Sequence, residues 1–326
     1  MSEWPLDWRA LVEEAIRRRK AEGLSQRGLA ALAGVSVPTV NGFEQGDIRL
    51  RFERVVAILE ALNLIVRTGR PDSFQAFLTA ARRRWSDLTS SLPDDHPSRQ
   101  PQGHSEQAYV INGLPEEASS ARLHEALSRA PKTSGWSPFW MPTRPDLRPV
   151  HQDGLLECWL GRPDVDRQFN DPAHSDFWRV SRDGQAYLQR GYQEDDPDIL
   201  TPGTIFDWTL PIWRTAELIL HAAHLARAFG AEDDARIRFI GRYTGLEGRE
   251  LVSWAKPLNA LDERYRSRSA KADLAAEAEL LGIEDRLELL IIEFLSPLYE
   301  RFDGFQPHPA AVAAQLRDLR KSAGLV

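Results

Sequence analysis

The chain has 326 residues, 42% of them hydrophobic and ten of them Trp, which favours two folded domains and excludes a disordered protein. A single cysteine, Cys158, excludes an internal disulfide framework and fits a reducing cytoplasm, and the lack of any apolar run of about 18 residues excludes a membrane span. The net charge of -7 divides into +2 over residues 1–70 (11 Lys/Arg, 9 Asp/Glu) and -9 over the remainder (30 and 39), so only the N-terminal part is suited to meet phosphate.

The N-terminal part reads as a series of short helices. A first helix is expected over residues 6–22, two helices joined by a tight turn over 24–46, and a further helix over 51–63. Ser25 and Ser36 are placed to cap the two central helices, and Gly34 lies where the chain leaves the first of them in a left-handed conformation. This pattern predicts a helix-turn-helix.

A helix follows at about residues 72–90, and then a polar segment with three prolines at 90–105. Proline favours extended backbone, so this segment is predicted to be a stiff tether. The expected domains are 1–68, an all-α helix-turn-helix domain; 69–105, a linker helix and Pro-rich tether; and 106–326, a sensor or oligomerisation domain.

Residues 106–326 are predicted to be α+β, so the whole chain is a multidomain protein of an all-α and an α+β part. Aromatic and β-branched residues alternate in segments typical of strands. These segments are Tyr109–Asn112, Leu155–Leu160, Phe177–Val180, Ala186–Arg190 and Arg236–Tyr243. Asp183-Gly184 predicts a hairpin turn. Helices are expected over 209–229, 284–302 and 308–322.

Residues 9–65 resemble the lambda-repressor/Cro-like (XRE) family of helix-turn-helix transcription regulators. The resemblance is carried by Leu24-Ser25-Gln26, Leu29-Ala30, Ala33-Gly34-Val35-Ser36, Thr39-Val40, Phe43-Glu44 and Gly46. It implies that the second central helix enters the major groove of duplex DNA while the first crosses the backbone. The DNA-binding residues that it implies are Gln26, Ser36, Val37, Pro38, Thr39, Asn41, Arg49 and Arg51.

Within this set, Gln26 and Ser36 are expected to bind phosphate, and Arg49 and Arg51 are placed for the DNA backbone. Val37, Pro38, Asn41 and Gly42 would face the base edges, where Val37 can touch a thymine methyl and Asn41 can pair with adenine. Because few of these side chains hydrogen-bond, specificity is expected to depend on phosphate geometry and DNA deformability. An alternative is a helix-turn-helix that serves assembly only.

Two runs of basic residues, Arg17–Lys20 and Arg82–Arg84, are candidates for further phosphate contacts or for solvated helix faces. His221 and His224, with Glu217 one turn earlier, suggest a metal site, but a histidine buried in the core is the favoured interpretation. The acidic residues Glu194-Asp195-Asp196 are read as an exposed loop, with Mg²⁺ binding or pairing with Arg190 as alternatives.

The C-terminal part contains blocks that mix aromatic and charged residues: Phe177–Gly184, Arg190–Asp195, Leu210–Glu217 and Thr244–Arg249. They resemble an accessory domain of bacterial AlbA/Schlafen-type proteins, a resemblance that implies no defined activity. From the residues, aromatics together with arginines can line a ligand pocket or a self-association surface. The arginines in question are Arg190, Arg214, Arg242 and Arg249.

The sequence therefore predicts a cytoplasmic, sequence-specific, repressor-like transcription regulator. It is expected to bind double-stranded DNA as a homodimer, with a C-terminal domain that dimerises, senses a small-molecule or protein signal, or both. No cofactor, metal, membrane contact or enzymatic activity is expected. Alternatives are an antitoxin-like or phage-defence component whose C-terminal domain binds a protein partner, and an enzymatic C-terminal domain using Glu194, Asp195 and Arg190.

Overall fold

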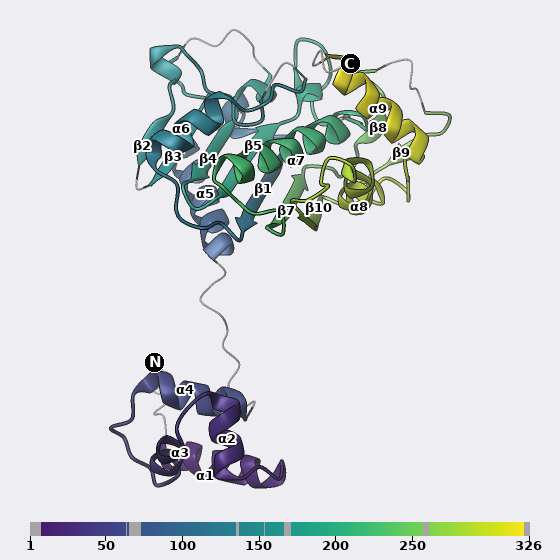
Figure 1. The fold of residues 1–326 in the computed structure, drawn as a ribbon. Coiled ribbons are helices and arrows are strands. Elements are labelled where there is room, and N and C mark those ends of the chain that lie inside the picture. Colours follow the sequence, from purple (N-terminus) through teal and green to yellow (C-terminus); the bar gives the residue numbers. More distant parts are fainter. Residues whose placement is uncertain are drawn as a thin grey trace. The chain divides into compact units, whose positions relative to one another are not determined.

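The computed structural model describes residues 8–62, 64, 73–134, 137–152, 154–165, 171–256 and 261–322. The chain divides into two compact units, residues 1–73 and 74–326 (Figure 1). Within the described ranges, no helix is long and apolar enough to cross a membrane.

Unit 1 is a small helical domain. Its described helices are α1 (Trp8–Ala21), α2 (Gln26–Ala33), α3 (Val37–Glu44) and α4 (Phe52–Ala61). One apolar cluster joins all four, and its buried members are Val12, Ala15, Leu29, Ala30, Val40, Phe43, Val55, Ile58, Leu59 and Leu62. The predicted helical fold of this part is confirmed.

The turn between α2 and α3 has the local geometry that its residues predict. The Ser25 hydroxyl accepts a hydrogen bond from the Gly28 backbone N–H at 3.0 Å, and the Ser36 hydroxyl accepts one from Thr39 at 3.3 Å. Gly34 ends α2 with φ of 63°, a left-handed conformation that side chains with a Cβ disfavour. Capping at both starts and a glycine at the end fix the sharp change of direction between the helices.

Unit 2 is built on a large antiparallel sheet. Among the described residues its strand order is β10-β7-β1-β5-β4-β3-β2. These strands are β1 (His104–Asn112), β2 (Val150–Gln152), β3 (Leu155–Trp159), β4 (Phe177–Ser181), β5 (Gln185–Gly191), β7 (Arg236–Thr244) and β10 (Lys271–Glu279). A small second sheet consists of β6 (Ile205–Asp207), β8 (Glu250–Val252) and β9 (Tyr265–Arg266).

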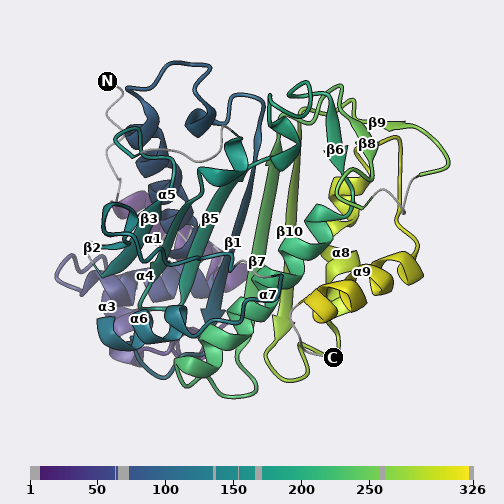
Figure 2. The ribbon, with the colours of Figure 1, turned by 90° about the horizontal axis from the view of Figure 1, so that it is seen from above.

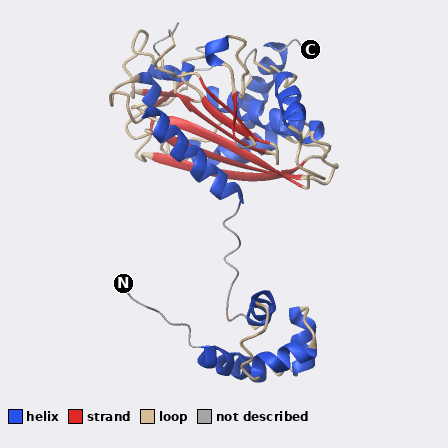
Figure 3. Ribbon diagram, turned by 90° about the vertical axis from the view of Figure 1, so that its left-hand side faces the viewer, coloured by secondary structure: helices blue, strands red, loops and turns tan. Residues whose placement is uncertain are grey.

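Helices cover both faces of the large sheet. The helices of unit 2 are α5 (Ser73–Thr89), α6 (Ser120–Ser128), α7 (Leu210–Ala228), α8 (Leu287–Tyr299) and α9 (Pro309–Ser322). Short 3-10 turns are η1 (Pro97–Arg99), η2 (Pro145–Leu147), η3 (Pro172–His174) and η4 (Gln193–Asp195). Helix α5 lies across one face (Figure 3), and α7 lies across the other (Figure 2). Helix α8 packs on β10, and both α8 and α9 contact α7.

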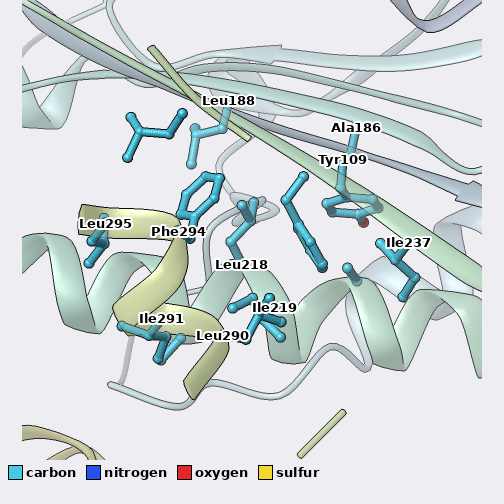
Figure 4. Close-up of a cluster of buried hydrophobic side chains, with 14 of the residues drawn as sticks. Tyr109, Ala186, Leu188, Leu218, Ile219, Ile237, Leu290, Ile291, Phe294 and Leu295 are labelled. Atoms are coloured by element: carbon cyan, nitrogen blue, oxygen red, sulfur yellow. The ribbon is translucent and has the colours of Figure 1, made fainter. Parts of the chain in front are cut away.

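The two faces of the sheet bury different apolar clusters because side chains alternate along each strand. In β1, Ala108 and Val110 pack with Phe74, Phe77 and other residues of α5. Tyr109 and Ile111 belong to the larger cluster on the opposite face. Figure 4 shows that cluster, where side chains of the sheet meet those of α7 and α8.

The predicted linker and tether at residues 69–105 need correction. Helix α5 packs against the sheet through Phe74, Phe77 and Leu78, so it belongs to unit 2. The Pro-rich segment forms the turn η1, where Ser98 is fully buried, and it then enters β1. Pro93 and Pro97 start hydrogen-bonded turns instead of extending a free chain.

Candidate nucleic-acid interface

Helix α3 has one buried and one exposed face. Val40 and Phe43 are fully buried, and the Trp8 ring meets Phe43 edge-on at 5.6 Å between ring centroids. The exposed face carries Val37, Asn41 and Gln45 at intervals of four residues, where side chains of a helix share one face. The exposed face of α3 is therefore a continuous stripe held by a packed helix.

A partly buried ion pair holds α3 against α1. The Arg19 guanidinium donates to both carboxylate oxygens of Glu44, at 2.5 and 3.0 Å, and to the Leu24 carbonyl at 2.8 Å. The Gln26 amide donates a further hydrogen bond to Glu44 at 2.8 Å. Burial opposes ionisation, but these donors hold the pKa of Glu44 below its ordinary value. The last residue of α3 is thus tied to both preceding helices.

The structure brings most of the predicted DNA-binding residues to the surface around α3. Ser36, Val37, Pro38 and Asn41 are exposed, and Asn41 accepts a long hydrogen bond of 3.5 Å from Gln45. Gln45 was not predicted, although it lies one helical turn after Asn41 and that spacing could have identified it.

Thr39 and Gln26, both predicted to bind DNA, make contacts within unit 1 instead. Thr39 is only 5% exposed, and its hydroxyl lies 2.8 Å from that of Ser36, so it supports the helix start instead of facing solvent. The Gln26 amide nitrogen is engaged with Glu44. Since Glu44 comes 18 residues later, the sequence around Gln26 gave no sign of this bond.

The loop between α3 and α4 presents exposed cations and apolar side chains. Arg49 donates to Asp47 at 3.0 Å while its side chain stays 87% exposed, and Arg51 is also exposed. Ile48 and Phe52, at 80% and 77% exposure, alternate with these arginines. Large exposed apolar side chains beside cations are typical of a contact surface.

Two exposed arginines that were not among the predicted DNA-binding residues lie on α2 and α4, the helices that flank α3. Arg27 is in the first turn of α2, and Arg54 is in the first turn of α4. Basic side chains near helix starts are well placed for phosphate, which a helix N-terminus also attracts.

The basic run of α5 has a structural role. Arg82 donates to Glu106 at 2.7 Å, and Arg84 donates to Glu157 at 3.0 Å. Both carboxylates are buried on the sheet face that α5 covers. Arg83 is exposed. Two of these three arginines therefore anchor α5 to the sheet.

The interpretation of Glu194 and Asp195 as an exposed loop is wrong. Their exposures are 3% and 2%, since the turn η4 packs against β6 and η3. Asp195 pairs with Arg249, whereas Arg190 pairs with Asp176 through Nε at 2.8 Å.

His221 is a core residue, as the favoured interpretation held. It is 1% exposed, and its Nδ1 lies 2.9 Å from the Tyr109 hydroxyl. Burial lowers the pKa of His221 to about 3, so the imidazole is neutral. His224 Nε2 lies 2.9 Å from the Ala126 carbonyl oxygen. In the part of the chain that the structure describes, no group of three or more His, Cys, Asp or Glu could hold a metal ion.

The comparisons with known proteins concern unit 1. Residues 16–65 match the family model of the helix-turn-helix, which supports a DNA-binding regulator of the XRE kind. No curated protein and no solved structure matches the chain. The match covers α2, α3 and α4, and it begins within α1.

Proposed function

We propose that this protein is a repressor-like transcription regulator that binds duplex DNA sequence-specifically as a homodimer, and that unit 2 dimerises the chain and senses a signal. The exposed stripe of α3 carries the proposal. Val37, Asn41 and Gln45 project from a helix that packing and the Arg19–Glu44 pair hold in place. A rigid helix with one exposed face fits the major groove of B-DNA.

Binding is proposed to combine few base contacts with many phosphate contacts. Asn41 can bond to the edge of adenine, and Gln45 offers a second amide. Exposed arginines on the flanking elements are suited to phosphate: Arg27, Arg49, Arg51 and Arg54. With so few base-reading groups, sequence preference would depend also on how readily the DNA deforms.

The proposal of a homodimer follows from the small charge of unit 1. Because residues 1–70 carry a surplus of only two positive charges, one copy is expected to bind the DNA backbone weakly. Two copies on a two-fold operator double both the phosphate contacts and the bases that are read.

The test is a gel-shift titration of the full chain against DNA from its own promoter region. Asn41→Ala should weaken binding to the preferred fragment, and Arg51→Gln should weaken binding to all fragments alike. Arg17→Gln is the matched control. Arg17 is exposed and paired with Glu14, on the face of α1 opposite Val12 and Ala15, which pack into the core. This pairing favours the solvated helix face over phosphate contacts for Arg17, so its replacement should leave DNA binding unchanged.

Unchanged affinity in both interface variants would overturn the proposal. Binding that is weakened equally by the control variant would contradict the assignment of α3 as the reading helix. Light scattering on the full chain tests the dimer, since a homodimer has twice the 36.9 kDa mass of one chain.

A further inference from the structure

A small cavity lies on the α7 face of the large sheet, at the end where η4 and the start of α7 meet the strands. Its floor is a row across three neighbouring strands. Ser105 of β1 lies opposite Arg190 of β5 on one side and opposite Tyr243 of β7 on the other. Its volume is about 50 Å³, which is room for a few non-hydrogen atoms.

Two arginines line this cavity. Arg190, whose side chain is 10% exposed, is held by Asp176, and Arg214 of α7 is held by Glu217 through Nη1 at 2.9 Å. Both arginines line the cavity, but neither carboxylate does. Each arginine therefore lies at the cavity with its carboxylate partner outside the lining, and that partner fixes the orientation of the guanidinium.

The one carboxyl group among the cavity-lining residues is Glu194. It accepts a hydrogen bond from the Asp207 backbone N–H at 2.9 Å, and burial raises its pKa to about 7. The charged and titratable groups around it are Tyr192, Asp195, Asp207, Tyr243, Arg190, Arg214 and Arg249. Near neutral pH the carboxyl is therefore partly protonated, and in that state it is a hydrogen-bond donor.

Aromatic rings form the apolar wall. Phe206 meets Tyr192 at 5.4 Å and Tyr243 at 6.0 Å between ring centroids, both edge-on. The Tyr192 hydroxyl donates toward the carbonyls of His104 and Thr244, at 3.0 and 2.8 Å, so this ring is fixed from behind. Rigid apolar walls with a few convergent polar groups are typical of small-molecule sites.

We propose that this cavity binds a small organic anion, whose carboxylate or phosphate head contacts Arg190 and Arg214 and whose apolar part lies against the aromatic wall. This inference names the ligand class for the sensing role of unit 2, and in that respect it rests on the proposed function. The binding itself involves unit 2 alone and is measured without DNA.

The experiment is calorimetric titration of the full chain with acetate, propionate and inorganic phosphate in turn. We expect binding of at least one probe, and propionate should bind more tightly than acetate because its ethyl group contacts the aromatic wall. Arg214→Gln, which alters a partly exposed side chain, should weaken that binding about 10- to 100-fold, as loss of a charged hydrogen bond does. Preference for phosphate over both carboxylates would identify the head group.

The matched control is Arg227→Gln. Arg227 is on the same helix and is also paired with a glutamate, Glu284, but it does not line the cavity. Equal affinity of the Arg214 and Arg227 variants would overturn the proposal, and so would the absence of binding by every probe at millimolar concentration.

Glu194→Gln provides an independent readout. The wild-type chain should lose affinity as the pH rises above 7 and the carboxyl ionises, whereas the variant should keep it. A variant that folds normally and binds no probe at pH 6 would contradict the site.

If probes bind as expected while DNA affinity stays the same with and without them, the site stands and the sensing role fails.

Discussion

Arg249 and Asp195 form an ion pair with two hydrogen bonds, 2.8 and 2.7 Å long, in which the side chains are 0% and 1% exposed. The same guanidinium donates to three carbonyls, those of Gln102, Gly245 and Ile205. Its flat face lies over the Tyr192 ring, with the carbon at its centre 4.7 Å from the ring centroid. One side chain thereby joins η4, β6, the start of β1 and the turn after β7.

Arg249→Met should therefore lower the free energy of unfolding by about 3–5 kcal/mol, because it leaves the Asp195 carboxylate buried without its cation. Arg242→Met is the control, since its pair with Asp273 is partly exposed and should contribute less than about 1 kcal/mol. Urea denaturation, monitored by Trp fluorescence, measures the free energy of unfolding of both variants. Similar losses in the two variants would contradict a structural role specific to Arg249.

Two buried groups should give opposite pH dependences of stability. Burial lowers the pKa of His221 from 6.5 to about 3, so the unfolded chain binds the extra proton and stability falls as the pH falls through that range. Burial raises the pKa of Glu194 from 4.5 to about 7, so the folded chain binds the extra proton and stability falls as the pH rises through that range. Between about pH 5 and 6 the two slopes, each about 1.4 kcal/mol per pH unit, should largely cancel.

Single variants should reveal each slope. In Glu194→Gln the free energy of unfolding should increase from pH 5 to 6, because the His221 contribution remains. In His221→Gln it should decrease over the same interval. Denaturant titrations at several pH values check this, and identical slopes in the two variants would exclude the burial of one of these groups.

The Arg19–Glu44 pair should stabilise unit 1 and also position α3. Arg19→Met should lower the free energy of unfolding of this unit by about 1.5–3 kcal/mol, since it removes charged hydrogen bonds from a mostly buried carboxylate. Arg18→Met changes the neighbouring, more exposed pair with Glu22 and should have little effect. Amide hydrogen exchange of α3 is the measurement, and equal protection in the two variants would contradict this role.

The salt dependence of DNA binding should identify the phosphate contacts. Arg51→Gln should make the slope of log affinity against log salt concentration shallower by about 0.9, the value for one phosphate contact on duplex DNA. Arg17→Gln should leave the slope unchanged. A parallel shift of the whole line, without a change of slope, would show that Arg51 acts on something other than phosphate.

The position of α5 predicts where the chain can be divided. A fragment of residues 73–326 should fold, because it keeps the packing of Phe74, Phe77 and Leu78 on the sheet. A fragment that starts at residue 106 loses this cover, uncovers Tyr187 and Phe177 and truncates β1, so it should aggregate. Circular dichroism and light scattering distinguish the two outcomes, and a soluble, cooperatively folding shorter fragment would restore the tether hypothesis.

The sequence was most informative where structure depends on neighbouring residues. Ser25, Gly34 and Ser36 act within one helical turn, so the helix-turn-helix could be predicted from spacing alone. The aromatic and β-branched segments of β3, β4, β5 and β7 likewise predicted strands, and Asp183-Gly184 predicted the hairpin between β4 and β5.

Long-range partners were the part that sequence could not supply. Strand β10 was missed because Lys-Ala-Asp-Leu-Ala-Ala-Glu-Ala-Glu is rich in helix-forming residues, and only pairing with β7 makes it a strand. Asp195 looked exposed because its partner, Arg249, comes 54 residues later. Of the four arginines considered for a pocket, Arg190 and Arg214 line the cavity, while Arg242 pairs with Asp273 and Arg249 is fully buried.

Two consecutive residues of β1, Ser105 and Glu106, lie on opposite faces of the large sheet. Ser105 lies in the cavity floor, and the next residue, Glu106, accepts a hydrogen bond from Arg82 of α5 on the opposite face. Helix α5 is the first described element after unit 1 along the chain. The cavity and α5 therefore meet the same strand at neighbouring residues on its two faces, so any change in the position of β1 would affect both.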